Sequence, residues 1–156
     1  MAAWAKVHRV VRIVYLPLII LFIVGILVQA LLIGQHLFAN ASATPHVELG
    51  WPLAHMFAPL VFLVSLFTGG RRSFWITSIV WFADAFLQPI LAAFAEEGPN
   101  TVAGYHVANA LVLFALSLWL AQQAWHMVMH KPVGAPRSQP PVPRAPALQP
   151  PPARRM

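Results

Sequence analysis

The sequence predicts an all-α integral membrane protein: an antiparallel four-helix bundle followed by a disordered, proline-rich tail. Of its 156 residues, 59% are hydrophobic and 9% are charged, whereas soluble domains are about one-quarter charged. Four apolar runs each have the roughly 20 residues that cross a bilayer as a helix. Helices are expected because lipid offers the backbone no hydrogen-bond partners. The predicted helices cover about 13–35, 47–68, 74–95 and 102–126.

The first run follows a basic segment, and the small residues at 39–43 offer a possible signal-peptide cleavage site. The run is longer than the about 7–15 apolar residues of a signal peptide, so we expect a retained helix. Pro52 lies near the start of the second helix, where a missing N–H costs little. Pro59 and Pro89 lie inside the second and third helices and predict kinks there.

The distribution of charge predicts the orientation. Four antiparallel helices would place every basic residue at one end, and Glu48, Glu96 and Glu97 at the other. Cytoplasmic segments of membrane proteins are enriched in Lys and Arg, so we expect a multi-pass protein of the inner (plasma) membrane with both termini cytoplasmic. The expected partners are the lipid bilayer and its anionic headgroups, together with a further subunit of a membrane complex, and not nucleic acid. The ten basic residues are Lys6, Arg9, Arg12, Arg71, Arg72, Lys131, Arg137, Arg144, Arg154 and Arg155.

The composition changes sharply after the last apolar run. Residues 131–156 are rich in proline, arginine and alanine. Such a segment cannot bury a core, so a disordered cytoplasmic tail is predicted there. The membrane domain would then comprise residues 1–130.

Polar side chains inside the predicted helices are the main indication of function, because intramembrane polarity is costly. A rise of about 1.5 Å per residue places His55 and Asp84 roughly 12 and 15 Å below the outer helix ends. Four further polar residues also fall in the outer half of the bundle, whereas the inner half is almost purely apolar. These four residues are Gln29, Gln88, His106 and Asn109.

Two imidazoles from different helices can be the axial ligands of a haem. His55 and His106 are the best candidate pair. His46 is a substitute, which we expect to reach over the site from a loop. Asp84 would orient His55, and the amides Gln29, Gln88 and Asn109 would surround the site. Alternatively, His55 and these amides only join helices by hydrogen bonds.

These residues lead to three functional hypotheses. The first is a small membrane protein whose outward-facing histidine site binds b-type haem for electron transfer. The second is a non-catalytic accessory subunit, and the third is a proton or ion pathway through Asp84. The chain has no cysteine, which excludes disulfides and thiolate chemistry. It also has no hydrolytic motif and no phosphate-binding loop, so an enzyme is not indicated.

The stretches "HVELGWPLAH", "LQPILA" and "YHVANALVLFALSLWLAQQAW" resemble a family of small, uncharacterised bacterial four-helix membrane proteins. The likeness covers about residues 8–126. A looser likeness connects the chain with the bis-histidine haem bundles of haem A synthase and di-haem cytochromes b. This second likeness implies haem ligation by histidine. However, the Arg that often follows a ligand histidine in haem A synthase is absent after His55 and His106, which Met56 and Val107 follow.

Overall fold

The computed structural model describes residues 2–97 and 101–129, and all the regular elements of these residues are helical. Four of the helices are long and apolar enough to cross a membrane, which confirms the number of helices predicted. The proposed tail, 131–156, lies outside the described residues, as does the His130 side chain. The elements are α1 (Ala2–Ala39), α2 (Thr44–Pro52), the π-helix η1 (Leu53–Phe57), α3 (Ala58–Ser65), α4 (Arg72–Glu97) and α5 (Thr101–Met129).

The helices extend beyond the apolar runs. α1 begins at Ala2 rather than at residue 13, because the basic N-terminal segment contains no proline or glycine that would interrupt a helix. The second helix begins at Thr44 rather than at 47, with Pro45 in its first turn, where proline is tolerated. The earlier start places His46 on the helix, so the expectation that His46 belongs to a loop is wrong.

The second helix changes its winding once, immediately before Pro59. In η1 the Ala58 N–H donates to the carbonyl of Leu53, five residues earlier. Pro59 has no N–H, and its ring would clash with the carbonyl of His55 in a regular α-helix. A wider π turn at this place accommodates the ring, so Pro59 changes the helix as the sequence suggested. α4, by contrast, continues as one α-helix through Pro89.

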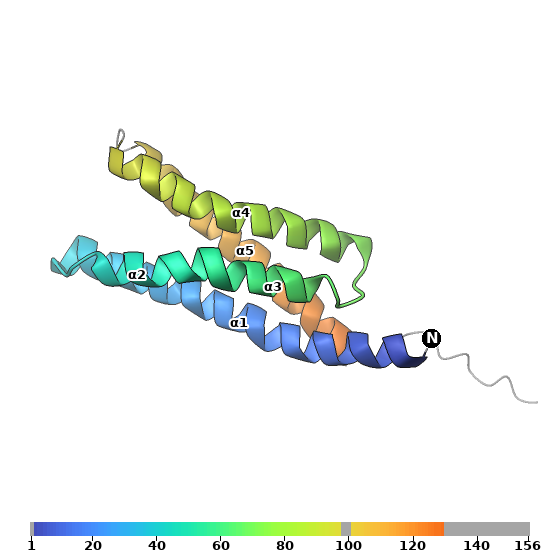
Figure 1. Ribbon diagram of the computed structural model, residues 1–156. Helices are drawn as coiled ribbons and strands as arrows, with labels where there is room; N and C mark the ends of the chain where they lie inside the picture. Colours follow the sequence, from blue (N-terminus) through green and yellow to red (C-terminus); the bar gives the residue numbers. More distant parts are fainter. Residues whose placement is uncertain (1, 98–100, 130–156) are drawn as a thin grey trace, which may run out of the picture.

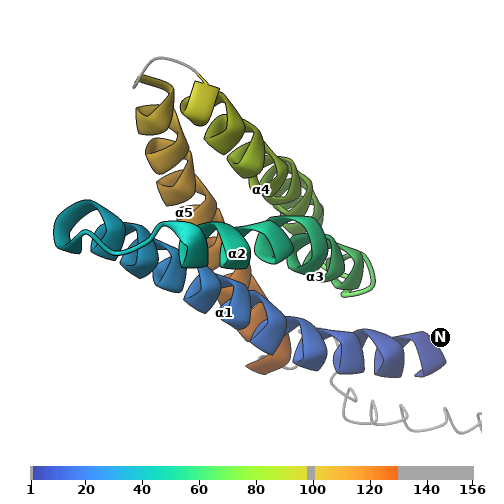
Figure 2. The same cartoon turned by 60° about the vertical axis from the view of Figure 1, so that its left-hand side comes forward.

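The chain forms two helical hairpins that pack against each other (Figure 1). The first pairs α1 with the α2–η1–α3 helix, and the second pairs α4 with α5. α1 and α3 contact one another, and these two helices also pack on α5 and α4, respectively. The hairpins diverge toward the end formed by the last turns of α1 and α4 (Figure 2). This end, called the outer end below, carries most of the candidate site residues.

The buried core lies where the two hairpins cross. Phe22 of α1 contacts Trp81 of α4 edge-on, with ring centroids 4.8 Å apart. The Trp81 indole N–H donates to Ser117 Oγ of α5 at 2.8 Å, and both side chains are fully buried. The opposite surface of every helix exposes large apolar side chains, as expected for a surface in contact with lipid. This core fixes the distance between the hairpins below the polar residues.

At the other end, Arg12 joins the first helix to the turn after α3. Its Nε donates to the Thr68 carbonyl at 2.7 Å, and its Nη2 donates to the Gly69 carbonyl at 3.2 Å. These carbonyls follow the end of a helix, where a cation is favourable. Gly69 has a φ of +63°, and a Cβ at this position would collide with the His8 ring. The turn therefore requires glycine and fixes the start of α4.

Candidate functional site

His46 connects α2 with α1 at the outer end of the bundle. Its Nδ1 lies 3.1 Å from the Gln29 carbonyl oxygen. Gly50, one turn after His46, faces the Gln29 side chain, and a Cβ built on Gly50 would lie 2.8 Å from Gln29 Nε2. The missing side chain of Gly50 therefore allows α2 to approach α1 closely enough for His46 to reach the carbonyl.

His106 makes the matching connection in the second hairpin. Its Nδ1 lies 3.1 Å from the Gln88 carbonyl oxygen, so the ring of an α5 residue is held against α4. The same type of contact thus occurs in both hairpins: an imidazole on one helix bonds to a glutamine carbonyl on the neighbouring helix. His46 and His106 are each half-buried.

The two imidazoles lie close together across the bundle. Their ring centroids are 6.4 Å apart, and the ring planes are inclined by 83°. A carbonyl oxygen can only accept a hydrogen bond, so Nδ1 carries the proton in both neutral rings. The Nε2 atoms of His46 and His106 then hold free lone pairs. Two such atoms cannot hydrogen-bond to each other, but both are suited to bind a metal.

Other polar atoms of this region have no hydrogen-bond partner within the described chain. They are both amide atoms of Gln29, Nε2 of Gln88 and Oδ2 of Asp84. Asn109 Nδ2 lies 3.5 Å from the backbone carbonyl of Asp84, so α5 approaches α4 here as well. Gln29, Asp84, Gln88 and Asn109 are called the outer cluster below. Buried polar atoms without partners are unfavourable, so this cluster has the capacity to bind a polar or charged group.

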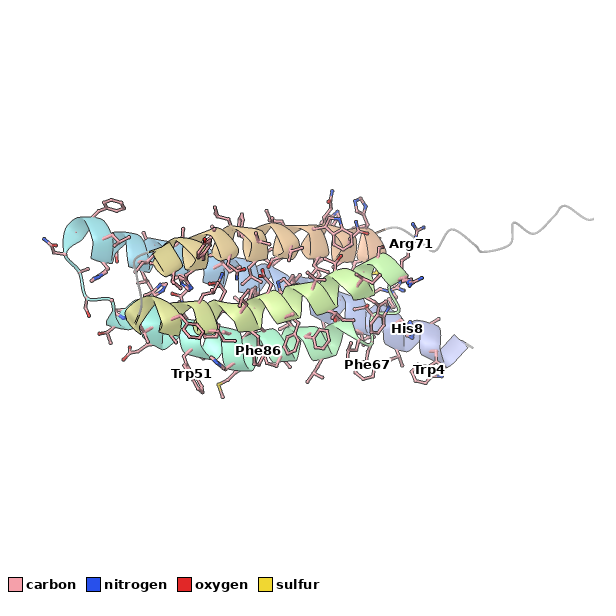
Figure 3. The ribbon with its side chains drawn as sticks, turned by 90° about the horizontal axis from the view of Figure 1, so that it is seen from above. Trp4, His8, Trp51, Phe67, Arg71 and Phe86 are labelled. Atoms are coloured by element: carbon pink, nitrogen blue, oxygen red, sulfur yellow. The ribbon has the colours of Figure 1, made fainter. Side chains whose placement is uncertain are left out.

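His55 lies elsewhere. Its Nδ1 contacts the Trp51 carbonyl at 3.0 Å, and its ring stacks on the Trp51 indole at 4.6 Å. The ring also approaches Phe86 of α4 at 5.9 Å. Trp51 and Phe86 lie together at the edge of the bundle (Figure 3). His55 thus faces outward, and within the described chain it forms no hydrogen bond with Asp84 or His106, the partners that the sequence suggested.

The helix start and the helical spacing explain why His46, and not His55, lies near His106. The helix start at Thr44 turns His46 toward α1, and a residue nine positions later cannot share its direction. Sequence reasoning also missed Gly50 and the two glutamine carbonyls. The spacing of His46 and Gly50, four residues apart on one helix face, was the available indication. Backbone carbonyl acceptors leave no such pattern in a sequence.

The number of metal-ligating side chains decides whether a bare metal ion or a haem suits this place better. Among the residues described, no three His, Cys, Asp or Glu side chains gather in a way that could hold a metal ion. The facing pair of His46 and His106 provides only two nitrogen donors. Haem brings four equatorial nitrogens of its own and needs only one or two axial protein ligands. The pair is therefore better suited to haem than to a bare metal ion.

Comparisons of the chain with protein-family models, with curated proteins and with solved structures give no match.

Proposed function

We propose that this protein is a small multi-pass membrane protein that holds one b-type haem between His46 and His106 and serves in electron transfer. The single observation that carries the proposal is the arrangement of these two rings. The ring centroids lie 6.4 Å apart, so His46 on α2 and His106 on α5 are near enough that both imidazoles could hold one haem.

The hydrogen bonds at Nδ1 support the same assignment. Ligating histidines commonly donate their second ring N–H to a carbonyl or carboxylate, which fixes the ring orientation and raises ligand basicity. His46 and His106 have such a carbonyl partner in Gln29 and Gln88. The haem would supply a one-electron couple, and the two carbonyls would hold the ligands in place in both oxidation states.

The outer cluster has N–H donors that suit the carboxylate side chains of a haem. The amide nitrogens of Gln29 and Gln88 are buried without partners in the described chain, and amide N–H groups donate to carboxylates. Haem propionates are carboxylates that would meet these donors. The apolar core around Phe22 and Trp81 closes the site from below.

The orientation belongs to the same proposal. Arg12 contacts the turn after α3, so the basic start of α1 and the Arg71–Arg72 pair share one end of the bundle. Trp4, His8 and Arg71 lie at this end, far from Trp51 (Figure 3). By the enrichment of cytoplasmic segments in Lys and Arg, this end is cytoplasmic. The histidine pair would then occupy the outer half of the inner membrane.

A spectroscopic experiment tests the proposal. The full chain is produced with a haem supply and purified in detergent, and its reduced-minus-oxidised absorption spectrum and low-temperature electron paramagnetic resonance are recorded. We expect a low-spin signal of two axial imidazoles that is lost in His46→Ala and in His106→Ala. His55→Ala is the matched control and should keep the full signal. Haem retained by both ligand variants, or lost in His55→Ala, would refute the assignment.

One observation favours an accessory subunit as the second candidate. The contacts of His46 with Gln29, His106 with Gln88 and Asn109 with Asp84 all join neighbouring helices. Such contacts stabilise helix packing in a membrane without any cofactor. In that case the purified protein is colourless, and His46→Ala lowers stability without a spectroscopic change.

A further inference from the structure

Basic side chains of α1 and of the turn before α4 come together at the inner end of the bundle, opposite the outer end. Arg12 on α1 donates to the carbonyls of Thr68 and Gly69. Arg71 follows Gly69 by two residues, or at most about 8 Å of chain. Arg9 precedes Arg12 by three residues on α1, a spacing at which helical side chains are neighbours. Arg9, Arg12, Arg71 and Arg72 are called the basic junction below.

The basic junction has no acidic partner among the described residues. The chain has four acidic residues, of which Glu48 belongs to α2 and the other three to α4. The first of these three, Asp84, follows Arg72 by twelve residues, or about 18 Å of helix. The Arg12 guanidinium donates to neutral carbonyls, and the other three arginines are exposed. Because like charges held close together repel, an anion from outside the chain would stabilise this place.

The basic junction also adjoins the apolar surface of the bundle. Ile13 directly follows Arg12, and its side chain is 50% exposed. Ile76 comes one turn after Arg72 and is also 50% exposed. Both belong to helices that are long and apolar enough to cross a membrane. The Trp75 indole N–H donates to a carbonyl of the turn before α4, and tryptophan is typical of the level of the lipid head groups. A ligand here therefore meets cations at one end and apolar side chains below.

We propose that the basic junction binds the head group of an anionic phospholipid, whose acyl chains lie along the exposed side chains of α1 and α4. Guanidinium groups form paired hydrogen bonds with phosphate oxygens. A soluble anion would lack the apolar contacts, and a zwitterionic lipid carries a cation beside its phosphate. The site is therefore selective for a net negative head group joined to hydrocarbon chains. In the orientation proposed above, this lipid belongs to the cytoplasmic leaflet, where anionic lipids attract basic segments.

Native mass spectrometry of the full chain in detergent measures the binding. The protein is titrated with dioleoyl phosphatidylglycerol and with dioleoyl phosphatidylcholine, which have the same acyl chains, and with two soluble anions, glycerol phosphate and tetraglutamate. We expect the first phosphatidylglycerol to bind at least tenfold more tightly than phosphatidylcholine and than either soluble anion. Equal affinity for the two lipids would overturn the proposal. A soluble anion that binds as tightly as phosphatidylglycerol would also overturn it, because the occupant would then not be a lipid.

A control of equal charge separates the basic junction from the general attraction of a basic chain for anions. Arg71→Gln/Arg72→Gln removes two charges from the junction, and Arg154→Gln/Arg155→Gln removes two outside the described residues. The first double variant should abolish the tenfold preference, and the second should retain it. Arg9→Gln, at an exposed position of α1, should weaken the preference at least threefold and keeps the test decisive if the first variant does not fold. Equal losses in the two double variants, or no loss in a folded junction variant, would refute a local site.

The lipid site and the proposed haem site do not depend on each other. Arg71 lies far from Trp51, which shares α2 with His46 (Figure 3). His46→Ala should therefore keep the preference for phosphatidylglycerol, and the Arg71→Gln/Arg72→Gln variant should keep the spectroscopic signal of the haem. Failure of the haem assignment and failure of the lipid site are therefore distinguishable.

Discussion

Gly50→Leu should displace His46 without changing any candidate ligand. A Cβ at Gly50 would lie 2.8 Å from Gln29 Nε2, a separation that real Cβ atoms essentially never show. The remaining carbons of leucine would occupy the space of the Gln29 amide, so either this flexible side chain turns aside or α2 moves away from α1, and both change the surroundings of His46. Overpacking of this kind costs about 1–3 kcal/mol, and each ~1.4 kcal/mol corresponds to a tenfold change in affinity.

Two other glycines provide matched controls. A Cβ at Gly25 would lie 2.8 Å from Leu53 Cδ1, so Gly25→Leu overpacks the same pair of helices away from His46. A Cβ at Gly34 would meet nothing within 4 Å, so Gly34→Leu should not destabilise the protein. We expect Gly50→Leu and Gly25→Leu to lower the free energy of unfolding by similar amounts of about 1–3 kcal/mol.

The assays separate stability from site geometry. Unfolding in mixed micelles gives the free energy, and transfer of haem to an acceptor protein gives the affinity. Gly50→Leu should weaken haem binding about tenfold or more, whereas Gly25→Leu should leave it nearly unchanged. In protein without haem, the same displacement should speed hydrogen exchange at Nδ1 of His46. If both variants weaken haem binding equally, the reasoning that Gly50 positions His46 is wrong.

Two predictions concern the bundle itself. Trp81→Phe removes the N–H that donates to Ser117 Oγ at 2.8 Å and leaves a buried hydroxyl with one bond fewer. This variant should lower the free energy of unfolding by about 1–2 kcal/mol. Trp125→Phe, at a half-exposed position, is the control and should change it little. Equal losses of stability in the two variants would contradict a stabilising role of the Trp81–Ser117 hydrogen bond. Arg12→Met removes two donors to the turn after α3 and should cost about 1–2 kcal/mol. Arg71→Met, an exposed control, should cost much less, and thermal unfolding monitored by circular dichroism compares the two.

The candidate residues show where sequence reasoning stops. Periodicity and depth indicated a set of polar residues in the outer half of the bundle, and the relevant histidines were among them. The choice between His46 and His55 depended on the first residue of a helix and on its direction. A helix start three residues earlier than expected places His46 on the helix, where it points about half a turn away from His55. The sequence suggested His55 with His106, whereas the structure brings His46 to His106.

The pattern of hydrophobicity alone determined the number of helices and their order. The reason is that a chain in lipid must satisfy its backbone hydrogen bonds within each segment, so the length and composition of a run decide the element. Only the tertiary structure decided which imidazoles meet, because that depends on how closely α2 approaches α1 at Gly50 and on which carbonyls accept the Nδ1 protons. These are contacts between residues distant in the chain, and no local pattern records them.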